Sequence, residues 1–167
     1  MKIDKTTKRW IRNEADEKAA FAGCRVDESR GQFVIDWAKE NLVLWEGECA
    51  GQPLIATDWQ YDCAIRLFGW VRKSDRWKRE IRRFREALIG KPKKNKKSPT
   101  VAWWMLYLLD GDGEPGQNCY TAAKDGQQAM IVQEHAIKMV QGSPTLGQYM
   151  RINKTDKSIT VDETNSK

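Results

Sequence analysis

The chain has 167 residues, of which 40% are hydrophobic and 31% charged, and its net charge is +6. This composition is typical of a globular protein that is long enough to bury a core. No apolar run reaches the length of a membrane-spanning helix, and the first residues lack the apolar stretch of a secretory signal. We therefore expect a cytosolic protein with no membrane partner.

The cysteine and histidine content argues against several classes of site. Cys24, Cys49, Cys63 and Cys119 are widely spaced and form no C-x-x-C pair, so neither a zinc site nor a disulfide framework is indicated. Reduced, mostly buried thiols are the expected state. The only histidine, His135, lies in a helical pattern, where a helix-surface position is favoured over a role as base or ligand.

Positive charge is concentrated in one stretch of the chain. Residues 72–97 contain thirteen Lys or Arg and three Asp or Glu, a net charge of +10, so the remainder carries −4. A basic segment beside a near-neutral body indicates partners that carry phosphate. A solvated helix face is the alternative interpretation, and charge alone does not separate the two.

The first half of the chain predicts two helices after a polar N-terminal segment at residues 1–30. Apolar residues recur at helical spacing over residues 32–44, and a loop follows at residues 47–53. The second helix has a capping box formed by Thr57 and Gln60, and it ends at Gly69.

Residues 74–89 are ambiguous. Trp77, Ile81, Phe84 and Leu88 have helical spacing, yet a strand is needed before the lysine-rich loop that follows. We interpret residues 84–90 as a short strand with a helix or turn before it.

The second half alternates helices and strands. The pattern predicts a helix from Ser98 to Leu109, a buried strand at residues 118–123, a helix from Asp125 to Val140, and a hairpin that pairs residues 149–152 with 158–161. This βαβ progression predicts an α/β fold with a mainly parallel sheet flanked by helices, and with the Lys97-Ser98 pair of a phosphate-binding loop between its first strand and helix, the sheet is expected to be of the P-loop NTPase type. The ligand is then expected at the carboxyl ends of the strands.

The loop before the helix at Ser98 is the main candidate site. The phosphate-binding pattern G-x-x-x-x-G-K-[ST] requires a Lys that reaches the β and γ phosphates and a hydroxyl that binds Mg²⁺. Lys97 and Ser98 fit these two roles, but Lys91 and Lys96 stand at the two glycine positions. A left-handed Lys96 would cost about 1–2 kcal/mol. A solvated polylysine loop is the competing interpretation.

Several motifs in order resemble a known family. They are Gly47-Glu48-Cys49-Ala50-Gly51-Gln52-Pro53, Asp58-Trp59-Gln60, Leu67-Phe68-Gly69-Trp70, Arg82-Arg83-Phe84-Arg85-Glu86-Ala87, the lysine-rich loop, Tyr120-Thr121-Ala122-Ala123 and Gln128-Ala129. Together they resemble the N-terminal ATPase part of large terminase subunits of tailed bacteriophages, which package DNA into procapsids. The resemblance covers roughly residues 30–165. It implies an incomplete ATPase domain over residues 31–167, without the nuclease domain.

The resemblance also implies roles for individual residues. Trp59 and Gln60 would contact the adenine of ATP, although Gln60 is equally explained as the capping residue of its helix. Lys93, Lys94, Asn95, Lys96, Lys97 and Ser98 match the family's phosphate loop, with ATP and Mg²⁺ as cofactors. Within it, Lys97 and Lys93 would act on the phosphate charge, and Ser98 would bind the metal. Lys93 replaces an arginine and lacks its planar fork.

The partners implied by the resemblance are double-stranded DNA, the terminase small subunit, the portal protein and further copies of the chain, in the host cytoplasm. An ATPase of this kind also needs an apolar strand that ends in Asp-Glu. Ile159-Thr160-Val161-Asp162-Glu163 has that outline, but a hairpin strand with a polar tail explains it better. The alternative function is therefore a non-enzymatic remnant that binds nucleic acid by charge. A Rossmann oxidoreductase is disfavoured, because no G-x-G-x-x-G follows a strand.

Overall fold

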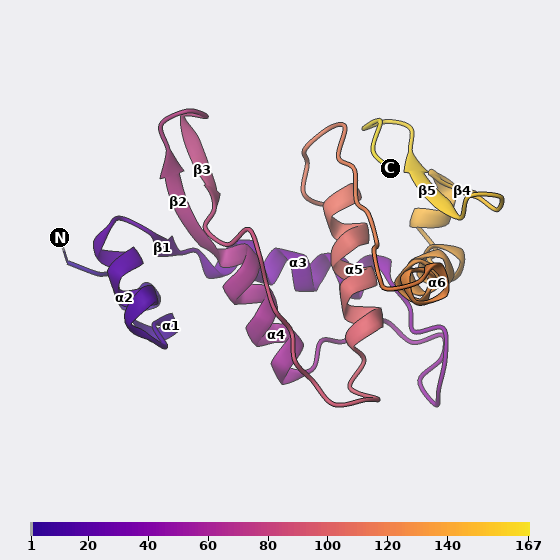
Figure 1. Ribbon diagram of the computed structural model, residues 1–167, viewed down its shortest axis with the longest axis horizontal. Helices are drawn as coiled ribbons and strands as arrows, with labels where there is room; N and C mark the ends of the chain where they lie inside the picture. The colour runs from indigo at the N-terminus through magenta and orange to yellow at the C-terminus, as the bar shows by residue number, and fades with distance from the viewer. Residues whose placement is uncertain (1) are drawn as a thin grey trace. The chain divides into compact units, whose positions relative to one another are not determined.

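The computed structural model describes residues 2–167 and divides into two compact units. Each unit is made of two segments of the chain. The first unit contains the described residues up to Ile35 together with Ala56–Leu88, and the second contains Asp36–Ile55 and Ile89–Lys167. Helix α3, Glu28–Asn41, runs from one into the other (Figure 1). No helix among the described residues is long and apolar enough to cross a membrane.

The first unit combines short helices with a small antiparallel sheet. Its elements are α1 (Lys5–Trp10), α2 (Glu14–Phe21), β1 (Arg25–Val26), α4 (Asp58–Ala64), a π-helical turn (Ile65–Gly69), β2 (Trp70–Ser74) and β3 (Arg79–Arg82). The strands are ordered β1-β2-β3. Trp70, Val71 and Ile65 are completely buried in its core. Gly31 lets α3 pass close to the π turn, since a Cβ there would lie 2.5 Å from Ile65 Cα.

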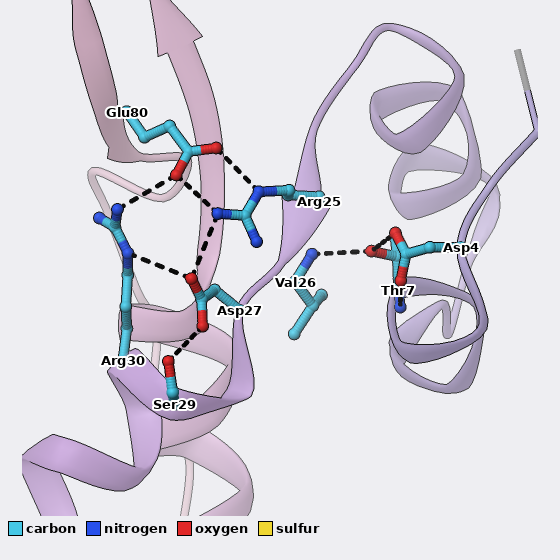
Figure 2. Close-up of polar contacts among 8 residues, drawn as sticks. All are labelled: Asp4, Thr7, Arg25, Val26, Asp27, Ser29, Arg30 and Glu80. Atoms are coloured by element: carbon cyan, nitrogen blue, oxygen red, sulfur yellow. Dashed lines mark hydrogen bonds and ion pairs between the residues drawn. The ribbon is translucent and has the colours of Figure 1, made fainter.

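The sequence of residues 2–30 has no clear periodicity, but this segment forms two helices and a short strand. Both helices here are short, six and eight residues, and each begins at a side-chain cap, Asp4 for α1 and Asn13 for α2. The buried Thr7 hydroxyl donates to Asp4 at 2.7 Å and accepts from the Val26 amide at 2.8 Å (Figure 2). Helices this brief are held by caps and tertiary hydrogen bonds rather than by an apolar stripe.

Residues 70–90 differ from the sequence prediction. The region before the lysine-rich loop is the β2–β3 hairpin, in register from Val71↔Arg82 to Ser74↔Arg79, and residues 84–90 contain no strand. The helical spacing of the apolar residues was misleading because Trp77 belongs to the hairpin's turn and is exposed. Phe84 is half-buried and its ring lies edge-on to that of the buried Trp70, with 6.4 Å between the ring centroids, whereas Leu88 is fully exposed, so these two positions do not form one face of a helix.

The second unit is mainly helical. Its elements, besides the end of α3, are α5 (Lys97–Leu109), α6 (Gly126–Gly142), a 3-10 turn (Leu146–Gln148), β4 (Met150–Asn153) and β5 (Ser158–Val161). Trp103, Leu106, Met139, Val140 and Leu146 are buried. The predicted helices at 98–109 and 125–140 and the C-terminal hairpin are confirmed, with at most two residues of difference at helix ends.

The fold is mixed α/β, but the predicted mainly parallel sheet is not found. Both sheets formed by residues 2–167 are small and antiparallel. The prediction of a buried strand at residues 118–123 was wrong, because these residues form no strand and Tyr120 is 85% exposed. Short apolar runs such as this one resemble buried strands, although periodicity does not establish a pairing partner.

Candidate functional site

The lysine-rich loop runs from Lys91 to Lys96 and leads directly into α5. All six of its residues are exposed. Helix α5 has thirteen residues, so its first backbone N–H groups and its positive end face the loop. The loop therefore presents ammonium groups next to a helix N-terminus, an arrangement that favours an anionic ligand.

Lys96, which stands at the second glycine position of the phosphate-loop pattern, has a left-handed backbone conformation. Its φ and ψ are 52° and 31°, in the left-handed region. The Lys96 carbonyl accepts hydrogen bonds from Thr100, 3.1 Å from the amide and 2.6 Å from the hydroxyl. Thr100 is buried, so the first turn of α5 fixes the residue that precedes it. The chain thus accepts a strain of about 1–2 kcal/mol at Lys96.

Lys97, the first residue of α5, turns its side chain back over the loop. Its ammonium Nζ donates to the backbone carbonyls of Lys91 and of Pro92, the latter at 3.1 Å. The Asn95 amide lies 3.4 Å from the Lys93 carbonyl and 3.5 Å from that of Pro92. The loop is therefore closed by its own polar groups, and the Lys97 ammonium is held against its backbone carbonyls.

The remaining predicted residues lie in the loop or at the start of α5. Ser98 follows Lys97 in the first turn of α5, and Lys93 and Lys94 are exposed within the loop. Lys94 also has a positive φ, 65°. The structure thus brings together Lys93, Lys94, Asn95, Lys96, Lys97 and Ser98 as one continuous loop and helix start, and their contacts with a ligand stay a prediction.

Trp59 and Gln60 belong to the first unit, whereas the loop belongs to the second. Gln60 forms the predicted capping box of α4: its Oε1 accepts from the Thr57 amide at 2.8 Å and from the Thr57 hydroxyl at 2.9 Å. Gln60 is buried, and Trp59 is half-buried. The structural role of Gln60 is therefore confirmed, and adenine contact by either residue stays a prediction.

The possible acidic motif at residues 159–163 is part of a hairpin. Ile159 and Val161 are buried on one side of β5, which pairs antiparallel with β4. Asp162 follows the strand and forms an ion pair with Arg151 at 2.6 Å, in which both side chains are mostly exposed. This geometry agrees with a hairpin strand followed by a polar tail.

The histidine and cysteines form no common site. His135 is half-buried and accepts at Nδ1 from Trp45 Nε1 at 3.2 Å; burial lowers its pKa, against opposing effects of Glu46 and Glu134. All four cysteines are free thiols. Among residues 2–167, no group of three His, Cys, Asp or Glu side chains could hold a metal ion.

Sequence reasoning missed the residues that shape the loop. Thr100 and the carbonyls of Lys91 and Pro92 act through contacts that the phosphate-loop pattern does not specify. The one available signal was a hydroxyl residue four positions after Lys96, since a helical Thr can bond the carbonyl of residue i−4.

Comparison with known proteins gives one structural match. No protein-family model matches the chain, and no curated protein does. The crystal structure of the HK97 bacteriophage large terminase is similar, with a TM-score of 0.67 and 22% sequence identity over 82% of this chain. The chain has a terminase large subunit-like fold.

The terminase likeness concerns the fold alone, because the identity is low. This chain spans 26% of the HK97 large terminase. The predicted resemblance to large terminase subunits is thereby confirmed at the level of fold, and the activity of a complete terminase is not carried over by it.

Proposed function

We propose that this chain is the nucleotide-binding part of a terminase-related DNA-packaging motor. In this proposal, the loop from Lys91 to Ser98 binds ATP with Mg²⁺ in the host cytoplasm, and binding is coupled to movement of duplex DNA. The observation that carries the proposal is the left-handed Lys96 directly before Lys97 at the start of α5. Added support comes from the terminase-like fold.

The residues at the start of α5 fit a polyphosphate in charge and hydrogen-bonding capacity. Lys97 would exchange its bond to the Pro92 carbonyl for a phosphate oxygen, and the first amides of α5 would donate to the same group. Lys93 and Lys94 would offset further phosphate charge. The Ser98 hydroxyl would be a ligand of Mg²⁺, which neutralises and orients the phosphates. By resemblance, Trp59 and Gln60 would face the adenine.

The proposed partners are duplex DNA, a terminase small subunit, a portal protein and further copies of the chain. Phosphate contacts by the basic residues between Arg72 and Arg85 would hold DNA without reading its sequence. ATP binding and DNA binding would then depend on different residues, and mutations can separate them.

A second candidate is a nucleic-acid binder that acts through charge alone. It is favoured by the exposure of the lysine-rich loop and by the ion pair of Asp162 with Arg151, which engages the carboxylate of the possible acidic motif. In that case the loop would attract any polyanion, without preference for a nucleotide.

Lys97→Ala separates the two candidates. If the loop is a nucleotide site, this variant loses Mg²⁺-dependent binding of a fluorescent ATP analogue and keeps its affinity for duplex DNA. If charge alone acts, it loses only a small increment of DNA affinity, with a salt dependence shallower by about one unit. Lys124→Ala is the matched control, because Lys124 is exposed and lies outside the loop. Failure of the unmodified chain to bind any nucleotide would contradict the ATP proposal.

A further inference from the structure

The β2–β3 hairpin ends in an exposed tryptophan. Its two strands are joined by the turn Asp75–Lys78, which Figure 1 shows at the far end of the hairpin from α4. Trp77 lies in this turn and is 57% exposed. The Arg76 guanidinium lies over its ring, 4.9 Å from the ring centroid. An indole at a hairpin tip adds nothing to a core, so its exposure calls for another explanation.

Positive charge surrounds this tryptophan. Residues 73–79 contain four cationic side chains and one carboxylate, and all of them are exposed. Among residues 2–167, Arg72, Lys73 and Lys78 have no carboxylate partner within ion-pair distance. Cations without partners on a projecting ribbon are available to an external polyanion.

The one carboxylate within the hairpin's strands is already engaged. Glu80 lies opposite Lys73 in the register, yet it binds Arg25 at 2.7 Å and Arg30 at 3.1 Å (Figure 2). The hydrogen bond from Arg25, the first of several causes, lowers the pKa of Glu80. Because two arginines outside the hairpin neutralise Glu80, this carboxylate leaves the positive charge of the turn unbalanced.

We propose that the tip of the β2–β3 hairpin binds single-stranded nucleic acid. Trp77 stacks on an unpaired base, and Arg72, Lys73 and Lys78 contact the flanking phosphates. Exposed aromatic rings between cationic side chains suit this ligand, because every base offers a flat face and every linkage a negative charge. A base within an intact duplex offers no free face, so the tip prefers single strands. The inference rests on the proposed contact with nucleic acid and adds the residue that stacks.

The test is fluorescence anisotropy of the full chain with a labelled oligothymidylate and with a blunt duplex of equal length. Trp77→Ala is expected to weaken binding of the single strand about tenfold, whereas Trp77→Phe keeps most of it. Lys73→Ala is expected to make the salt dependence shallower by about 0.7 for the single strand. The controls are Trp45→Phe and Lys124→Ala, which alter a tryptophan and an exposed lysine outside the hairpin.

Two results would overturn the inference, and they differ in what they say of the proposed function. If Trp77→Ala binds the single strand as tightly as the unmodified chain while duplex binding persists, the tip does not stack and the duplex contact stands. If the unmodified chain binds neither nucleic acid, the proposed contact with DNA fails together with the inference. Equal melting temperatures of Trp77→Ala and Trp77→Phe would establish that a loss of affinity is not unfolding.

Discussion

The ammonium of Lys97 donates a hydrogen bond to the backbone carbonyl of Pro92, five residues earlier, at 3.1 Å. This bond is exposed, so water competes for both groups and the net stabilisation is small. The Lys97 ammonium therefore stays near the loop, but it can exchange this hydrogen bond for one to another acceptor. A phosphate oxygen could replace the carbonyl as acceptor, and the new bond would be stronger because both partners are charged.

The first prediction concerns the left-handed residue of the loop. Lys96→Gly is expected to stabilise the fold by about 1 kcal/mol, since glycine relieves the strain at φ 52° but adds entropy to the unfolded chain. Chemical denaturation measures the difference. Lys93→Gly is the control: Lys93 has no positive φ, and there glycine should destabilise slightly. Equal effects of the two substitutions would contradict a left-handed Lys96.

The second prediction concerns Thr7, whose buried hydroxyl joins α1 to β1. Thr7→Val keeps the shape of the side chain but leaves the Val26 amide without its acceptor. We expect a loss of about 1–3 kcal/mol in unfolding free energy. The neighbouring Thr6→Val is the control, because Thr6 is exposed, and it should change the melting temperature little. An unchanged free energy of unfolding in Thr7→Val would mean that the N-terminal helices do not pack as described.

The third prediction concerns Asp16, a buried carboxylate between Arg83 at 2.7 Å and Arg66 at 3.0 Å. Burial acts to raise its pKa, but the hydrogen bonds from Arg83 and Arg66 outweigh burial and lower it. Asp16→Asn should cost about 3 kcal/mol near neutral pH, because both arginines lose their charged partner.

The pH dependence of that cost follows from the lowered pKa of Asp16. Its carboxylate stabilises the folded state above the pKa of the unfolded chain, and this contribution disappears as pH falls through the lower folded pKa. The stability difference between the unmodified chain and Asp16→Asn should therefore shrink below about pH 4. Glu14→Gln, at an exposed ion pair with Lys18, serves as the control. A difference that is constant down to strongly acidic pH would exclude the charged network.

The fourth prediction concerns His135, the only histidine of the chain. Its proton NMR titration should give a pKa below the ordinary 6.5, because burial disfavours the imidazolium. Trp45→Phe should raise this pKa, since it removes the donor to Nδ1 and exposes the ring. Neutral His135 stabilises the fold above pH 6.5, and this contribution falls as pH drops through the lower folded pKa. A titration at or above 6.5 would contradict the burial of this side chain.

The helices could be predicted from the sequence because their signals are local. The capping box of Thr57 and Gln60 and the apolar spacing of α5 and α6 are properties of a few neighbouring residues. Strands depend on partners that are distant in the sequence, so the β2–β3 hairpin was missed, and strands were expected at residues 84–90 and 118–123, where none forms. The short N-terminal helices were missed because they have no apolar face that a periodic pattern would reveal. Their caps and the hydrogen bond between Thr7 and the distant Val26 stabilise them instead.

The loop was located from the Lys97-Ser98 pair, and the conformation of Lys96 was anticipated as a condition of that pattern. The contacts that support the loop were only partly predictable. The two hydrogen bonds from Thr100 to the Lys96 carbonyl had a local signal in the i, i+4 spacing, but the turn of Lys97 towards the Pro92 carbonyl depends on how the loop folds back in space. No sequence spacing encodes that path when glycines are absent.

The most direct test of the nucleotide site is equilibrium binding of a fluorescent ATP analogue with Mg²⁺ to the unmodified chain and to Lys96→Gly. We predict saturable, Mg²⁺-dependent binding by both proteins, because Lys96 already has the backbone conformation that glycine would adopt. Absence of binding by both proteins, at concentrations where they are folded, would contradict the assignment of the loop as a nucleotide site.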